Sequence, residues 1–228
     1  MEAAFEIQRL EMTEISRYDV SELIEAQYQP GSHGRVLRNL PGITSKRKMD
    51  ELEATEQKRA LKEILSVYTL DHRFKAADIC RMHKLWLGGI YQWAGRYRQV
   101  NLSKGSFPFA AAVRIPDLMD TLQKKTLRRF TPCLFTTRPE IVHALAVVHT
   151  ELVLVHPFGE GNGRVARMLT IVMAVQAGLP PLDFGYLKGR KKQEYFRAVQ
   201  AGMNYDYGPM TEILNCVIER TLRLCPQP

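Results

Sequence analysis

Apolar residues recur at helical spacing along most of this chain of 228 residues. Positions three and four apart lie on one face of a helix, so this pattern predicts amphipathic helices. They are expected at residues 74–87, 116–130, 140–155, 193–203 and 210–224. A further segment, 165–177, is strongly apolar and contains neither proline nor glycine, which indicates a buried helix. The pattern favours an all-α fold.

Two segments in the first half of the chain add detail. The charged, alternating stretch 49–67 predicts an exposed helix, and Thr44 or Ser45 could cap its N-terminus. Residues 90–105 mix aromatic and β-branched residues with turn residues, which makes this segment the best place for a short β-hairpin. Within it we expect Trp93 and Tyr97 to pack in the core.

Composition and charge narrow the class of protein only slightly. The chain is 45% hydrophobic and 25% charged, as in ordinary globular domains. Its formal charge of +8 is spread over several segments, so solvated helix ends and loops explain most of it, and an acidic partner protein is a second use. No nucleic-acid-binding motif is present.

The cysteines and the hydropathy pattern indicate a compartment. Cys80, Cys133, Cys216 and Cys225 are scattered without CxxC spacing, which is typical of reduced thiols. No uncharged apolar run reaches about 18 residues, so no membrane span is expected. These features predict a cytoplasmic protein, and a role as a secreted effector stays open.

The segment HPFGEGNGRVAR, residues 156–167, carries the densest chemistry of the chain. Pro157 disfavours helix at His156, so the preceding helix should end there. The next helix should begin near 162–164, where free N–H groups and the helix dipole favour an anion. Arg164 and Arg167 are three residues apart and are expected on one face of that helix. Two guanidiniums beside free amides predict a polyphosphate site.

Two further side chains of this segment suggest a reaction. His156 can accept a proton near neutral pH. Glu160 is a hard oxygen ligand, and a single carboxylate suits Mg2+ that is shared with phosphates. The combination indicates metal-assisted transfer at phosphorus, with His156 as general base toward an attacking hydroxyl. His143 and His149 lie on the preceding apolar helix and are expected to be packed or hydrogen-bonded.

The same segment resembles the Fic family motif, H-P-F-x-[D/E]-G-N-G-R-x-x-R, and every defined position is filled. The resemblance implies a helical bundle with a small β-hairpin flap beside the active site. It also implies that His156 deprotonates a target hydroxyl and that Glu160 holds Mg2+. The implied phosphate-binding residues are Gly161, Asn162, Gly163, Arg164 and Arg167, of which Arg167 contacts the terminal phosphate.

The resemblance further implies an activity. Most members transfer AMP from ATP to a Ser, Thr or Tyr hydroxyl of a protein and release pyrophosphate. The related Doc kinases carry lysine at the position of Gly163 and transfer the terminal phosphate instead. Gly163 therefore favours nucleotidyl transfer.

A second resemblance lies upstream, where residues 93–98 match the family's W-A-G-x-[YF]-R segment. The flap that follows, about 98–112, is implied to lie over the nucleotide and to hold the target by main-chain pairing along a strand edge. Its nucleotide-side residues are expected to be Ser103, Lys104, Gly105 and Ser106. Phe107 is expected on the target side, and Tyr195 matches a family tyrosine near the nucleotide base.

The resemblance also suggests how the chain is divided and restrained. We expect an N-terminal arm at 1–30, the Fic domain at 31–215 and a C-terminal tail at 216–228. Many family members carry an inhibitory helix with the pattern [S/T]-x-x-x-E-[G/N], whose glutamate pairs with the last motif arginine. The sequence contains no such motif, because its one Glu-Gly or Glu-Asn pair is Glu160-Gly161. This predicts a separate antitoxin-like inhibitor protein; oligomerisation, or no restraint at all, is the alternative.

Two other functions stay open at this point. The donor could be UTP, GTP or CDP-choline, because a phosphate site does not read the base. From a different class, the chain could be a non-catalytic module that binds a nucleotide or a partner. The presence of both His156 and Glu160 argues against the module, since binding alone needs no base.

Overall fold

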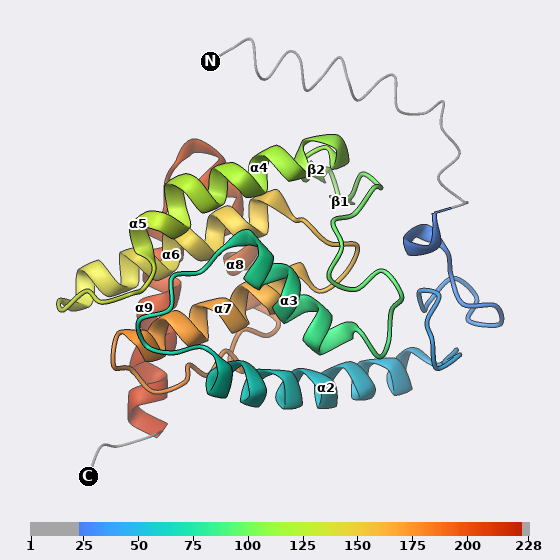
Figure 1. Ribbon diagram of the computed structural model, residues 1–228, viewed down its shortest axis with the longest axis horizontal. Helices are drawn as coiled ribbons and strands as arrows, with labels where there is room; N and C mark the ends of the chain where they lie inside the picture. The colour runs from blue at the N-terminus through green and yellow to red at the C-terminus, as the bar shows by residue number, and fades with distance from the viewer. Residues whose placement is uncertain (1–22, 225–228) are drawn as a thin grey trace.

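The computed structural model describes residues 23–224 and shows a bundle of helices with one small hairpin (Figure 1). The α-helices are α2 (Lys46–Val67), α3 (Ala76–Leu87), α4 (Ile115–Thr121), α5 (Arg128–Phe130), α6 (Arg138–Val155), α7 (Asn162–Gln176), α8 (Arg190–Ala201) and α9 (Gly208–Leu224). Short 3-10 turns lie at η2 (Ile24–Ala26), η3 (Ala112–Arg114) and η5 (Gly202–Asn204). The strands are β1 (Ser103–Lys104) and β2 (Phe107–Pro108), so the expected fold class is confirmed.

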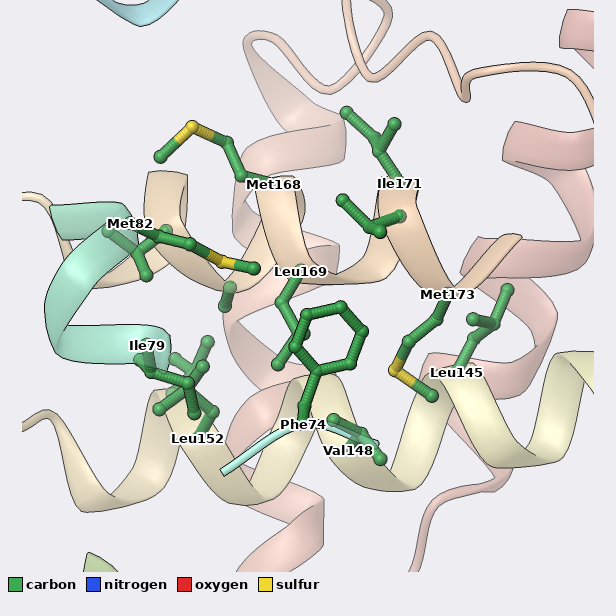
Figure 2. Close-up of a cluster of buried hydrophobic side chains, with 14 of the residues drawn as sticks. Phe74, Ile79, Met82, Leu145, Val148, Leu152, Met168, Leu169, Ile171 and Met173 are labelled. Carbon is green, nitrogen blue, oxygen red and sulfur yellow. The ribbon is translucent and has the colours of Figure 1, made fainter. Parts of the chain in front are cut away.

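The core lies where α6 and α7 pack against each other and against α3 (Figure 2). Leu145, Val148 and Leu152 of α6 point toward Leu169 and Met173 of α7, and all five side chains are buried. Each fully buried side chain of this kind stabilises the fold by ~1.5–3 kcal/mol. The two helices that flank the motif at 156–167 are therefore anchored in the core, and they hold the loop between them.

The predicted helices are present, with small shifts at their ends. Ser45 is the N-cap of α2 and accepts a hydrogen bond from the Lys48 amide at 3.4 Å, so of the two expected caps the structure selects Ser45. The helix expected at 116–130 is α4 and α5 joined by a π-helical segment, η4 (Leu122–Leu127). Its apolar side remains continuous because Ile115, Met119, Leu122 and Leu127 are all buried.

The hairpin lies at the end of the segment expected to contain it. Residues 90–102 contain no strand, because Tyr91 and Trp93 stack on each other at 4.7 Å and are buried in the core. The strands pair Ser103 with Pro108 and Lys104 with Phe107. Gly105 has a φ of 61°, which suits the first position of a tight two-residue hairpin turn. The hairpin still falls inside the range 98–112 expected for the flap.

Two expected domain boundaries do not match the packing. The tail expected at 216–228 begins inside α9, which runs to Leu224 and buries Val217 and Ile218. The arm expected at 1–30 lies outside the described residues up to residue 22. Its remaining part packs on the domain, since the buried Glu25 carboxylate accepts from the Gln99 and Val100 amides.

The described residues also bear on the expected compartment. Cys80, Cys133 and Cys216 are free thiols, and Cys225 lies outside the described residues. Between residues 23 and 224, no helix has the length and apolar character needed to cross a membrane.

Candidate active site

The motif at 156–167 forms the loop between α6 and α7. Helix α6 ends at Val155, as Pro157 predicted, and His156 adopts a left-handed conformation with a φ of 52°. Helix α7 begins at Asn162. The Asn162 side chain holds the loop closed: its Oδ1 accepts from the Phe158 amide at 2.8 Å, and its Nδ2 donates to the Phe158 carbonyl at 2.7 Å. Asn162 therefore acts on the loop through its side chain and can offer a ligand only its main chain.

The two glycines at the start of α7, Gly161 and Gly163, meet different structural needs. Gly161 has a φ of 85°, and a Cβ there would lie 2.7 Å from the Trp86 ring. Gly163 has an ordinary φ, and the nearest atoms to its Cβ would be the Tyr195 hydroxyl at 3.9 Å and the Arg167 guanidinium at 4.0 Å. Gly161 is thus required by the fold, whereas Gly163 keeps space open in front of the helix N-terminus.

A cavity of ≈ 380 Å³ opens between this loop, the hairpin and α8. Its volume falls in the range of small-molecule sites, about 300–1,000 Å³. The expected site residues that line it are Ser103, Lys104, His156, Glu160, Gly161, Asn162, Gly163, Arg167 and Tyr195. The first-turn N–H groups of α7, those of Asn162 and Gly163, have no acceptor within the helix, which gives the cavity two main-chain donors. Gly105 and Ser106 form the hairpin turn and do not line the cavity, and neither does Arg164.

His156 lies at one end of this cavity in a defined tautomer. Its Nδ1 is 3.1 Å from the Val153 carbonyl, which can only accept, so Nδ1 carries the proton and Nε2 keeps a lone pair. The imidazole stacks on Phe109 with ring centres 3.5 Å apart. Burial lowers the pKa of His156 to about 4. The side chain is therefore neutral at physiological pH and can accept a proton at Nε2.

Arg98 ties His156 to the flap. Its guanidinium is fully buried and donates to the carbonyls of His156, Val100 and Ala110. Val100 and Ala110 lie on either side of the hairpin, so one side chain fixes both arms of the flap relative to the base. Arg98 was not among the predicted site residues, although it ends the W-A-G-x-[YF]-R segment that could have marked it.

Arg164 and Arg167 are three residues apart on α7, but their side chains turn to different partners. Arg164 pairs with Glu53 of α2 at 2.7 Å and with Glu160 at 3.2 Å, and its guanidinium lies over the Trp86 ring. The buried Glu53 carboxylate draws it away from the cavity, because a buried charge needs a partner. Arg167 turns the other way, toward α8, and makes no ion pair with any carboxylate of residues 23–224.

Arg167 lies beside a buried chain of hydrogen bonds that joins Tyr195, His149 and Thr170. Its guanidinium lies 5.7 Å from the centre of the Tyr195 ring, and its Nε is buried without a hydrogen-bond partner among the described residues. The Tyr195 hydroxyl is 2.7 Å from Nε2 of His149, whose Nδ1 is 2.9 Å from Thr170 Oγ1. Burial lowers the pKa of His149 to about 3, so it is neutral, as expected of a packed histidine.

The direction of these bonds is set by Thr170. Its hydroxyl donates to the Ala166 carbonyl at 2.8 Å, so toward His149 it can only accept. His149 therefore donates from Nδ1 and accepts at Nε2 from the Tyr195 hydroxyl. The Tyr195 oxygen therefore keeps lone pairs beside Arg167, whose guanidinium packs over the Tyr195 ring. His143, by contrast, is exposed and meets only the rings of Phe130 and Tyr207.

Positive charge gathers at this side of the cavity. Lys104 from β1 and Lys192 from α8 line it together with Arg167. Burial lowers the pKa of Lys104, and the charges of Lys192 and Arg167 lower it further. Lys192 and Phe196, whose ring lies 4.3 Å from the Lys104 ammonium, were not predicted, because their place beside the motif depends on how α8 packs. The cations favour an anionic ligand with more than one charge.

Glu160 is the carboxylate that faces this cluster. Its Oε1 accepts from the Gly161 amide at 2.6 Å and from Arg164, and the side chain is 45% exposed. Within residues 23–224 no cluster of three or more His, Cys, Asp or Glu side chains could hold a metal ion by itself. A divalent cation here would share one protein carboxylate with oxygens of a bound phosphate, which is the arrangement that Mg2+ favours.

Comparison with known proteins agrees with this geometry. Residues 73–174 match the model of the Fic/DOC family. This part of the chain is therefore similar to Fic/DOC domains. Protein adenylyltransferase Fic of Nematostella vectensis is 29% identical over 149 residues, which are 64% of this chain and 32% of that protein. Protein adenylyltransferase VbhT of Bartonella schoenbuchensis is 28% identical over 187 residues, 82% of this chain and 37% of that protein. The chain thus spans about a third of the length of these relatives.

Solved Fic-domain structures share the fold. BepC from Bartonella tribocorum, solved with bound AMPPNP, superposes with a TM-score of 0.67 at 21% identity, over 88% of this chain and 97% of that one. The FIC domain of Bep8 from Bartonella sp. 1-1C gives a TM-score of 0.69 at 19% identity, over 85% and 95%.

Proposed function

We propose that this Fic domain transfers AMP from Mg-ATP to a Ser, Thr or Tyr hydroxyl of a target protein. The observation that carries the proposal is the meeting, in one cavity, of a neutral histidine with a free Nε2, a helix N-terminus and an arginine without a carboxylate partner. The names of the relatives, protein adenylyltransferases, support the same activity.

In this proposal each step is carried by particular atoms. His156 Nε2 accepts the proton of the target hydroxyl, whose oxygen forms a bond to the α-phosphorus while the bond from that phosphorus to the bridging oxygen breaks. Pyrophosphate leaves and AMP stays on the target. The main-chain amides of Asn162 and Gly163 stabilise charge on the phosphates. Arg167, with Lys104 and Lys192 beside it, binds the leaving phosphates.

Two roles implied by the family resemblance change in this proposal. Arg164 holds Glu160 in place through its ion pair and does not itself contact phosphate, because it lies outside the cavity. Tyr195 positions Arg167, which binds the phosphates, and does not contact the nucleotide base. The reason is that its hydroxyl is hydrogen-bonded to His149. Glu160 would hold Mg2+, which supplies positive charge for the phosphates.

The unpaired Arg167 also supports a separate inhibitor. A carboxylate placed against its guanidinium would compete with the terminal phosphate, and no carboxylate of residues 23–224 does so. A second protein that offers such a glutamate is therefore part of the proposal. On this basis, protein purified without partners is active.

The deciding experiment uses purified protein, Mg2+ and ATP labelled on the α- or the γ-phosphate, with a cell lysate as the source of targets. We expect α-label on protein, reduced about 10²–10⁴-fold by His156→Ala, because a general base is lost. His143→Ala is the matched control, since that exposed histidine lies on the same helix α6 and away from the cavity.

Other results would overturn the proposal in distinct ways. Label only from the γ-position identifies a kinase. Label only from UTP, GTP or CDP-choline identifies another donor. Absence of any covalent product, with nucleotide binding intact, identifies a non-catalytic module.

A further inference from the structure

A second cavity lies on the other side of the hairpin from the nucleotide cavity. Its volume is ≈ 250 Å³, below the range of about 300–1,000 Å³ typical of small-molecule sites. Its walls are apolar and come from β2, α4, α6 and η5: Phe107, Pro108, Leu118, Leu154, Val155 and Met203. Among its lining residues one side chain carries a formal charge, that of Glu151. The size suits a single amino-acid side chain better than a nucleotide.

The hairpin separates the two cavities strand by strand. Ser103 and Lys104 of β1 line the nucleotide cavity, and Phe107 and Pro108 of β2 line the second one. The Phe109 amide donates to the Leu102 carbonyl, so by the alternation of antiparallel pairs the carbonyl of Pro108 faces outward from β2. A target chain along this edge therefore runs beside the second cavity.

Glu151 has an incomplete set of partners. Its Oε1 accepts from the Tyr207 hydroxyl at 2.6 Å, and no other hydrogen bond or ion pair of the side chain is present among the described residues. Burial raises the pKa of Glu151, which shows that its charge is poorly solvated. Glu151 shares one face of α6 with Leu154 and Val155, three and four residues further on. A cation that reaches it along these apolar side chains would supply the missing partner.

Tyr205 lines the same cavity at its rim. The side chain is 75% exposed although it is a large aromatic residue, and its backbone has a φ of 58°. An aromatic ring at the rim of a cavity attracts a cation that comes over its face. Apolar walls, one carboxylate and an exposed aromatic ring together match a long basic side chain, whose stem is apolar and whose head is charged.

We propose that this cavity binds a lysine or arginine side chain of the target protein, within a few residues of the modified hydroxyl. The proposal rests on the proposed function. Glu151 precedes His156 by five residues, which is about 7.5 Å along the axis of α6 and about 140° around it, so the two side chains approach a target chain from different sides. Each residue of an extended chain advances about 3.3 Å, and successive side chains point to opposite sides. A few residues of the target therefore span the distance between the two groups.

The test maps modified residues by mass spectrometry after incubating wild-type protein and variants with Mg-ATP and lysates of bacterial and of animal cells. Lys or Arg within three positions of the modified residue should be enriched about tenfold in wild type over Glu151→Gln, as for one charge-assisted contact. Glu151→Lys should reverse the preference toward Asp and Glu. Glu212→Gln, which changes an exposed glutamate of α9, is the matched control.

Folding and function are checked separately. Glu151→Gln keeps an oxygen for the Tyr207 hydroxyl, so its thermal unfolding midpoint should match wild type. Tyr205→Ala, at an exposed position, is a second variant and should reduce the same enrichment. Equal site preferences in wild type and both variants, or enrichment of an apolar residue at those positions, overturns the basic-residue subsite while AMP transfer stands. Absence of α-label on any protein, including the enzyme itself, removes the proposed function instead.

Discussion

The two arginines of the motif, Arg164 and Arg167, lie at the same helix end and differ in what surrounds their side chains. The Arg164 guanidinium pairs with the carboxylates of Glu53 and Glu160 and lies over the Trp86 ring. Arg167 faces the cavity, and its Nε has no hydrogen-bond partner among the described residues. The first arginine stabilises the loop, and the second is left for a ligand. The difference shows that a residue's role follows from its partners more than from its place in a motif.

A comparison of two histidines, His83 and His156, leads to the same conclusion. Burial lowers the pKa values of both His83 and His156 to about 4. His83 uses both nitrogens, accepting from the Gly95 amide at 2.7 Å and meeting the Glu160 carbonyl at 3.0 Å. His156 uses one nitrogen and keeps the other free at the cavity. A low pKa therefore does not by itself identify a base, and the free lone pair does.

The largest expected effect comes from removing Arg164, the arginine that is paired with carboxylates. Arg164→Ala leaves the Glu53 carboxylate, 3% exposed, without its cation, and should lower the free energy of unfolding by about 3 kcal/mol. Urea unfolding measures this. Adding Glu53→Gln removes the unpaired charge while Tyr91 keeps its acceptor, so the double variant should regain part of the loss. An Arg164→Ala protein as stable as wild type would show that the pair contributes nothing.

A smaller loss of stability is expected from Gly161→Ala. The new Cβ would meet the Trp86 ring at 2.7 Å, which adds overpacking to the strain of a positive φ. Gly178→Ala is the matched control, because its φ of 78° carries similar strain and no atom lies within 4 Å of the new Cβ. Gly161→Ala should therefore cost about 2 kcal/mol more in urea unfolding. Equal losses in the two variants would contradict the role given to Trp86.

The smallest expected effect on stability comes from removing Arg167, the arginine without a carboxylate partner among the described residues. Arg167→Ala should leave the unfolding midpoint unchanged and weaken ATP binding about tenfold, since one charge-assisted contact to phosphate is lost. Calorimetric titration with ATP and Mg2+ measures this, and Arg197→Ala, an exposed arginine of α8, serves as control. If Arg167→Ala instead destabilised the fold and bound ATP normally, the contrast between the two arginines would be lost.

Much of the fold and of the site could be predicted from sequence. Helical periodicity located the helices, and Pro157 placed the end of α6 correctly. The hairpin was expected somewhat too early, because the aromatic residues that suggested strands, Tyr91 and Trp93, pack in the core. The roles of Arg98 and Lys192 were not predicted, because each depends on contacts between segments far apart in the chain.

The sequence by itself determined the helices, the resemblance to a family motif and the set of reactive groups in 156–167, because these depend on residue order and local spacing. The tertiary structure decided which of those groups face the cavity. Glu53 on α2 turns Arg164 away, Tyr195 on α8 supports Arg167, and Arg98 fixes the flap relative to His156. Such choices are made by charges and hydrogen bonds between distant segments, and these partners meet only when the helices pack.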